Sequence, residues 1–221
     1  MKRYGLLPGV IVAFSLTAVP FISFGRVEAG DRDALTAKLQ GADFAEHSII
    51  DQLKKSSDDQ AVHALMKIVE ERRDDWKLQI AAIRLLGEIA NPLAVDLLIR
   101  VVTDVFFTND CPALKWNGIV ALGNFRHDPR VMDALLYRLN EDTLYLREAV
   151  IQSLGRIGEK EALPYLISAL GDKHFSVKMN AIRALGEIED PGAIPFLEKV
   201  VKSEPDPLLR DEALRVLGVL K

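Results

Sequence analysis

The side chains that could carry out chemistry are few and scattered along this chain. The sequence has one cysteine, Cys111, and four histidines, which are His47, His63, His127 and His174. A single cysteine cannot form an intrachain disulfide or complete a Cys/His zinc cluster, so we interpret it as a half-buried thiol, with a bond to a second chain as the alternative. No nucleophile, base and orienting group recur together, and no phosphate-binding loop is present. We therefore predict no catalytic, cofactor-binding or metal-binding residues.

The balance of charge argues against nucleic acid as a partner. The chain carries 28 Lys and Arg against 32 Asp and Glu, a formal net charge of −4, and removal of residues 1–29 leaves 25 basic and 31 acidic residues. A surface of this sign repels a phosphate backbone. The sequence also lacks a basic stripe interleaved with aromatic residues, the pattern that would indicate nucleic-acid binding. We expect a protein or peptide partner.

The first 29 residues have the layout of a secretory signal peptide. Lys2 and Arg3 precede an apolar run over residues 6–24, and small residues lead to a cleavage site after Ala29. The alternatives are cleavage after Gly25 and retention of the run as a membrane anchor, because its length approaches that of a spanning helix. Two prolines and a glycine interrupt the run and favour cleavage. The sequence thus predicts an exported protein, periplasmic or secreted, that contacts the membrane only if the leader is retained.

The strongest signal in the sequence is an internal repeat of about 32 residues. The dipeptide Leu-Gly recurs at successive spacings of 36, 32, 31 and 32 residues. Its five copies are Leu86-Gly87, Leu122-Gly123, Leu154-Gly155, Leu185-Gly186 and Leu217-Gly218. The residues eight, four and three places before each leucine, and three places after it, are apolar or small, which is the spacing of one face of an α-helix. We call the predicted helix around each copy an A helix.

The glycine of each copy points to close packing between neighbouring repeats. Glycine inside a helix costs about 1 kcal/mol relative to alanine. Its recurrence near the end of every A helix therefore predicts that a neighbouring backbone passes too close to admit a Cβ.

A second apolar block, the predicted B helix, follows each A helix after a short turn. Its copies align without gaps at residues 94–102, 131–139, 162–170 and 193–201, and residues 61–69 match them. Three of the turns place a short acceptor side chain directly before a proline, a combination that begins helices: Asn91-Pro92, Asp128-Pro129 and Asp190-Pro191. One A/B pair hides only one side of its apolar stripe, so the pairs must stack. We predict an all-α, α/α superhelical solenoid of about five and a half pairs over residues 44–221, preceded by a short helix or flexible leader at 30–43.

This unit resembles the HEAT-like repeats named after the phycobilisome lyases. The copy that resembles them best, residues 172–201, has these family features: Lys178, Ala181, Leu185-Gly186, Asp190-Pro191 and Pro195. The same basic place holds Arg147, Arg210 and Lys115 in other repeats, and Gln79 departs from it. The resemblance implies a right-handed stack with the B helices on its concave side, and a fold shared by scaffolds and a few enzymes.

The enzymatic relatives fit this sequence poorly. Deoxyhypusine hydroxylase-like proteins build a di-iron site from His-Glu dipeptides, and none of the four histidines here is followed by glutamate. Bilin lyases of this type normally work inside the cell, which conflicts with an export signal. We therefore predict an exported, non-catalytic scaffold for protein or cell-envelope interactions. The alternatives are a lyase- or chaperone-like factor that handles a bound cofactor, and a membrane-tethered assembly factor.

The candidate partner-binding residues lie on the B helices. The positions two and six places after the start of each block should face the groove: His63, Lys67, Asp96, Arg100, Asp133, Tyr137, Pro164, Ser168, Pro195 and Lys199. Asp96 and Arg100 are one turn apart, so an intrahelical ion pair is the alternative use of this pair. Tyr165 and Phe196 lie beside the row as aromatic anchors, unless they pack between repeats.

Two further surfaces are candidates. The longest spacing contains Phe106 and Phe107, which are either a docking point or filler for a wider gap between repeats. The last A helix lacks a B partner, so we expect Val216 and Val219 to form an open apolar edge that mediates self-association.

Overall fold

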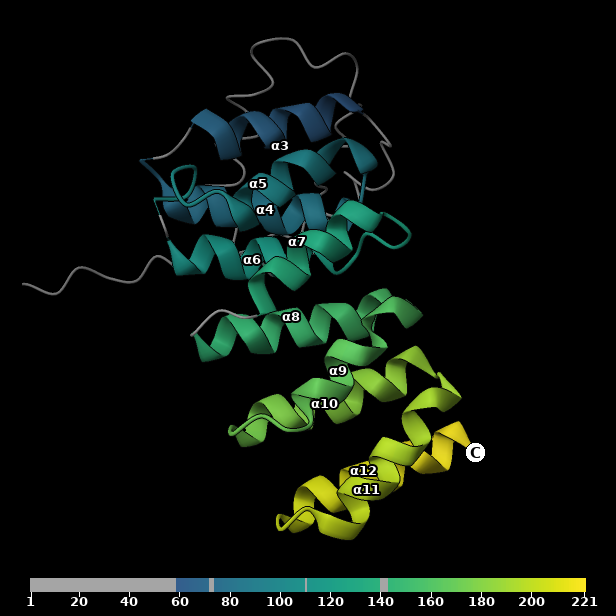
Figure 1. Cartoon of the computed structure of the whole chain (residues 1–221). Helices are drawn as coiled ribbons and strands as arrows, with labels where there is room; N and C mark the ends of the chain where they lie inside the picture. The colour runs from purple at the N-terminus through teal and green to yellow at the C-terminus, as the bar shows by residue number, and fades with distance from the viewer. Residues whose placement is uncertain (1–58, 72–73, 110, 140–142) are drawn as a thin grey trace, which may run out of the picture.

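The computed structural model describes residues 59–71, 74–109, 111–139 and 143–221. These residues form ten α-helices and three short 3-10 helices, with no β-strand among them. Figure 1 shows the helices stacked one below another from α3 to α12. The predicted all-α solenoid is confirmed. The predicted signal peptide and leader, the A helix of the first repeat and His47 lie outside the described residues.

The A helices form one layer of the stack. They are α4 (Trp76–Ile89), α6 (Pro112–Leu122), α8 (Leu144–Ile157), α10 (Phe175–Ile188) and α12 (Pro207–Leu220). Each packs against the next one along the stack. The leucine of every Leu-Gly copy is buried, as the apolar spacing predicts. Each such leucine contributes about 1.5–3 kcal/mol of hydrophobic stabilisation.

The B helices form the second layer. They are α3 (Asp59–Glu71), α5 (Val95–Thr103), α7 (Pro129–Leu139), α9 (Leu163–Ala169) and α11 (Ile194–Ser203). A 3-10 turn precedes three of them: η1 (Pro92–Ala94), η2 (Lys160–Ala162) and η3 (Pro191–Ala193). The predicted capping is confirmed, since the Asn91 side chain accepts a hydrogen bond from the Leu93 amide at 3.0 Å and the Asp190 carboxylate accepts one from the Gly192 amide at 2.7 Å.

The recurring glycines are explained by contact between successive A helices. A Cβ built on Gly87 would lie 2.7 Å from the Ala121 backbone, and one built on Gly123 would lie 2.9 Å from the Ser153 hydroxyl. Gly155 meets the Cβ and Cα of Ala184 on the next A helix, and Gly186 meets the side chain of Val216 at 3.0 Å. The predicted approach of a neighbouring backbone is therefore confirmed at Gly87 and Gly155, whereas the nearest atoms at Gly123 and Gly186 belong to a side chain. It is wrong for Gly218, which has nothing within 4 Å because no A helix follows α12 in the stack.

The exposed apolar residues of α12 differ from those expected. Val216 is buried, because it packs on Gly186 of α10, so its predicted place in an open edge is wrong. Val219 is exposed, as expected. Leu214 is 52% exposed, although the equivalent residues of the other A helices are buried. Each A helix packs against the B helix that precedes it, and α12 packs against α11 in this way, so the expectation that the last A helix lacks a B partner is wrong.

The B layer is not evenly packed along the stack. Helix α5 packs directly against α7, whereas α7 makes far less contact with α9 and with η2. The α5–α7 contact is therefore the closest one within the B layer, and the α7–α9 junction is among its looser ones. No described helix is both long and apolar enough to cross a membrane.

Candidate binding site on the B face

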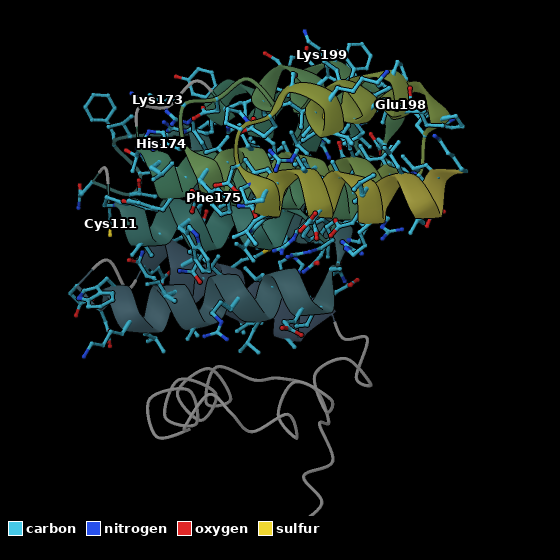
Figure 2. All side chains as sticks on the ribbon, turned by 90° about the horizontal axis from the view of Figure 1, so that it is seen from below. Cys111, Lys173, His174, Phe175, Glu198 and Lys199 are labelled. Atoms are coloured by element: carbon cyan, nitrogen blue, oxygen red, sulfur yellow. The ribbon has the colours of Figure 1, made fainter. Side chains whose placement is uncertain are left out.

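All ten predicted groove positions are exposed on the B helices. We call this exposed side of the B layer the B face. In the end-on view of Figure 2, Lys199 points outward from α11, away from the edge where α10 begins with Phe175. Their exposure makes the row available to a partner, and binding by it remains a prediction.

Ion pairs between successive repeats cross the B face from α3 to α5 and from α5 to α7. The Arg100 guanidinium of α5 donates to the Glu70 carboxylate of α3 at 3.1 Å. The Asp96 carboxylate of α5 accepts from Arg130 of α7 at 2.6 Å. The alternative of an intrahelical pair between Asp96 and Arg100 is therefore wrong, because each side chain reaches a partner in a neighbouring repeat.

Arg130 is the cation that joins α5 to α7. Besides Asp96, its guanidinium donates two hydrogen bonds to Asp128, at 3.0 and 2.7 Å. These hydrogen bonds hold the pKa of the Asp128 carboxyl below its usual value, with the positive charge of Arg130 adding to the effect. One guanidinium thus bridges two carboxylates at this junction.

The next junction, between α7 and α9, is open. A cavity of about 580 Å³ lies there, lined by His127, Pro129, Met132, Asp133, Leu136, Glu159, Glu161 and Tyr165. A second cavity of about 440 Å³ shares Leu136 and Tyr165 with the first and extends to Arg147, Ser168 and Asp172. We call the two together the α7–α9 cleft. Its size falls within the range of ordinary ligand pockets.

The first of these cavities carries an excess of negative charge. Asp133 and Glu161 are exposed, and neither makes a hydrogen bond or ion pair with another described residue. The Glu159 carboxylate accepts a hydrogen bond from the His127 amide at 2.7 Å and lies 3.7 Å from its ring nitrogen Nδ1. In the second cavity, Arg147 lies 3.6 Å from Asp172. The cleft therefore combines an apolar floor with carboxylates that no described cation neutralises.

The structure brings three of the predicted residues, Asp133, Tyr165 and Ser168, together in this cleft. Tyr137 is 64% exposed on the same helix as Asp133, and the Arg138 guanidinium lies 5.2 Å from its ring centre. The remaining predicted residues lie along α3, α5 and α11, where Lys67 forms an i,i+4 pair with Glu71 and Phe196 is half-exposed. They are not drawn into one site.

Sequence reasoning missed most of the cleft lining. Met132, Leu136, Glu159 and Glu161 were not among the candidate residues, although alignment of the B blocks places Glu161 where the preceding repeat has Arg130. That reversal of charge at one repeat position is the signal that could have located the site.

The two aromatic residues of the long loop have different roles. The Asp104 carboxylate accepts hydrogen bonds from the Phe106 and Phe107 amides at 2.9 and 3.1 Å, which fixes the loop. Phe107 is buried, with the Arg100 guanidinium 4.5 Å from its ring centre, whereas Phe106 is 88% exposed. The gap-filling alternative is right for Phe107, so docking through both rings is wrong. Only Phe106 is available to a partner.

A larger cavity, of about 730 Å³, lies on the other layer between α8 and α10. Its lining includes Arg156 and Arg183, but both are engaged: Arg156 donates to the Val120 carbonyl at 3.2 Å and Arg183 to Glu212 at 2.8 Å. Glu187 and Glu189 line the same cavity and offset the remaining positive charge. This cavity has neither an apolar floor nor unbalanced charge.

The histidines and the cysteine are not gathered into a site in the described part of the chain. No group of three or more His, Cys, Asp or Glu residues there is placed to hold a metal ion. Figure 2 shows Cys111 and His174 on the edge of the molecule where A helices begin, on the separate helices α6 and α10. Cys111 is half-buried, as interpreted from the sequence.

Comparison with known proteins identifies relatives in sequence. The HEAT repeat family matches residues 62–149 and 132–218. A deoxyhypusine hydroxylase from Danio rerio is 30% identical over 94 residues, which are 42% of this chain and 30% of that protein. The chain thus spans under a third of the length of this relative.

Solved structures with the same fold include natural and designed proteins. A designed armadillo repeat protein in complex with the peptide (KR)4 is 16% identical, with a TM-score of 0.57 over 86% of this chain and 92% of that one. The complex of CpcE and CpcF of phycocyanin lyase from Nostoc sp. PCC7120 is 24% identical, with a TM-score of 0.54 over 93% and 82%. These similarities establish the architecture, and the sequence match covers most of the chain from α3 to α12. The protein with these stacked helix pairs and its Leu-Gly column is therefore a member of the HEAT repeat family.

Proposed function

We propose that this protein is an exported, non-catalytic HEAT-repeat scaffold that binds a segment of a partner protein on its B face. The observation that carries the proposal is the α7–α9 cleft, which interrupts an exposed row of B-helix positions with an apolar floor and unneutralised carboxylates.

The arrangement of the B face suits a protein segment. Side chains along it are held on helices whose inward positions are buried, such as Leu98 and Leu135, so little order has to be imposed on binding. Solenoids commonly bind through such extended surfaces. Proteins of this fold include an armadillo design bound to a peptide and the complex of CpcE with CpcF. The architecture is therefore compatible with a peptide or a folded protein as partner.

Binding through the B face can be tested by photo-crosslinking in the native host. A photoreactive phenylalanine analogue would replace Tyr137, which is exposed beside the cleft, and, as the matched control, Arg84, which is exposed on α4 in the A layer. We expect discrete adducts from position 137 and none from position 84. Adducts from position 84 alone, or equal adducts from both, would contradict the proposal.

The export part of the proposal rests on the basic end, apolar run and small-residue site in residues 1–29. Its test is fractionation of the native host followed by N-terminal sequencing. We expect a soluble exported chain that begins at Gly30, or at Arg26 if cleavage follows Gly25. A chain in the membrane fraction that keeps residues 1–29 would replace the proposal with the membrane-tethered assembly factor.

The non-catalytic part has a specific competitor, because 94 residues match a deoxyhypusine hydroxylase at 30% identity. Protein purified from the native host should contain substoichiometric iron and show no visible absorbance. Stoichiometric metal or a bound chromophore would favour an enzymatic or cofactor-handling role instead.

A further inference from the structure

We infer that the α7–α9 cleft binds an arginine or lysine side chain of the partner segment between Asp133 and Glu161, with a neighbouring apolar side chain of that segment on the cleft floor. This inference rests on the proposed function and specifies the chemistry of the partner.

The preceding junction shows how such a cation is held. There the Asp96 carboxylate accepts a hydrogen bond from Arg130 at 2.6 Å. Asp96 stands two places after the first residue of its B block, residues 94–102. Arg130 directly precedes the next B block, residues 131–139, and its guanidinium also donates hydrogen bonds to the Asp128 carboxylate. One guanidinium between two carboxylates closes this junction, and α5 packs against α7.

The same three positions at the next junction lack the cation. The equivalents of Asp96 and Asp128 are Asp133 and Glu159, and the place of Arg130 is taken by Glu161. Three carboxylates thus line a cavity where the preceding junction has two carboxylates and a guanidinium. No described Lys or Arg pairs with Asp133 or Glu161, the like charges on this lining repel one another, and α7 and α9 make little contact.

The cations nearest the cleft are already engaged. His127 donates its amide to Glu159 and places its ring near the same carboxylate. Arg147 lies beside Asp172, and Lys160 of η2 lies 3.1 Å from Asp190 of the following repeat. Asp133 and Glu161 therefore have no cationic partner among the described residues. Charge complementarity then favours a ligand with a positively charged group.

The floor of the cleft adds a requirement for an apolar neighbour. Met132 is buried, Leu136 is half-buried, and Tyr165, which also lines the cavity, is 42% exposed. A tyrosine face attracts a guanidinium or ammonium group as well as apolar carbon. A peptide segment that alternates cationic and apolar residues matches both the carboxylates and the apolar floor. A free cation would bury none of the apolar surface of the floor.

The test is binding of a fluorescently labelled hexapeptide of alternating leucine and arginine, followed by fluorescence anisotropy. We expect the same peptide with citrulline, the neutral isostere of arginine, to bind at least tenfold more weakly. Replacement of leucine by serine should weaken binding at least fivefold. Equal binding of the arginine and citrulline peptides would overturn the inference.

Variants of the protein locate the site. Glu161→Arg supplies the missing cation from within the chain, so it should weaken peptide binding at least tenfold while the urea midpoint stays equal or rises. Glu161→Gln should weaken it at least threefold without adding a competing charge. The matched control is Asp211→Arg, an equal change of charge at an exposed α12 carboxylate that pairs with no other described residue. It should alter binding less than twofold, and a Glu161→Arg loss no greater than this one would refute the assignment.

Two outcomes separate this inference from the proposed function. If the peptide does not bind but crosslinks from position 137 persist, the inference of a cationic side chain in the cleft is wrong, and partner binding on the B face still holds. If crosslinks are absent as well, both fall. A wild-type dimer by light scattering that becomes monomeric on Glu161→Arg would make the occupant a second copy of this chain and would overturn the inference.

Discussion

Gly155 of α8 lies so close to Ala184 of α10 that a Cβ on the glycine would stand 2.7 Å from the Ala184 Cβ and 2.8 Å from its Cα. Backbone atoms of α10 cannot move aside as a flexible side chain can. The distance between these two A helices is therefore set by the absence of a side chain at residue 155.

Gly155→Ala should lower the free energy of unfolding by about 1–3 kcal/mol, because overpacking outweighs the gain in helix propensity. Gly218→Ala is the matched control, since it occupies the same repeat position with nothing within 4 Å. It should leave stability unchanged or raise it by up to about 1 kcal/mol. Urea unfolding followed by circular dichroism checks both, and equal effects at the two glycines would show that packing does not explain the column.

Leu154→Ala should lower the free energy of unfolding by about 2–5 kcal/mol, because Leu154 is fully buried in the central repeats and its truncation leaves a cavity. Leu214→Ala provides the comparison at an A-helix leucine that is 52% exposed. Its cost should be less than about 1 kcal/mol. An unchanged denaturation midpoint for Leu154→Ala would remove this leucine column from the core.

Phe107→Ala should destabilise the protein by about 3–5 kcal/mol, since it removes a buried ring that lies under the Arg100 guanidinium. Phe106→Ala, its exposed neighbour, should stay within about 0.5 kcal/mol of the wild type. Thermal unfolding measures both. A loss of partner binding caused by Phe106→Ala without a change in melting temperature would assign a docking role to that ring, whereas comparable destabilisation by both would contradict the observed burial.

Glu212 should give the stability a dependence on acid pH. Hydrogen bonds from Arg215, at 3.0 and 2.7 Å, and from Arg183, at 2.8 Å, lower the pKa of its carboxyl from 4.5 to about 2. Because the folded-state pKa lies below the unfolded one, the ionised carboxylate stabilises the fold above about pH 4.5, and this contribution is lost as the pH falls toward 2.

Glu212→Gln should therefore lower the free energy of unfolding by about 1–2 kcal/mol at pH 7, a value that allows for screening by solvent around both exposed arginines. The difference from wild type should shrink steadily between pH 4.5 and pH 2. Asp211→Asn, the neighbouring carboxylate without a described partner, should show little difference at any pH. Urea unfolding at several pH values checks the pattern, and a difference that grows toward pH 2 would reverse the sign of the argument.

Much of the fold could be predicted because it depends on local periodicity. The spacing of Leu86, Leu122, Leu154 and Leu185 identified the buried stripe of each A helix, and the Asn-Pro and Asp-Pro turns identified the B-helix starts. Exposure of the B-helix row followed from the same 3.6-residue geometry, since a helix that buries one face must expose the other.

Contacts between repeats could not be predicted in the same way. Asp96 pairs with Arg130, 34 residues away, and not with Arg100 on its own helix, because stacking brings the neighbouring repeat within 2.6 Å. Whether Phe106 or Phe107 turns inward depends on how the Asp104 turn orients the loop. Val216 is buried because α10 offers a glycine to receive it.

The sequence by itself determined the helical repeat, its period and the residues that each helix must hide from water, since these follow from side-chain polarity along one chain. Only the tertiary structure decided which repeats pack closely and which leave a cleft. The free energy of each junction depends on the charges and shapes that two separate helices present to each other, as Arg130 against Asp96 and Glu161 against Asp133 show. Opposite charges meet at the α5–α7 junction, whereas three carboxylates line the α7–α9 cleft.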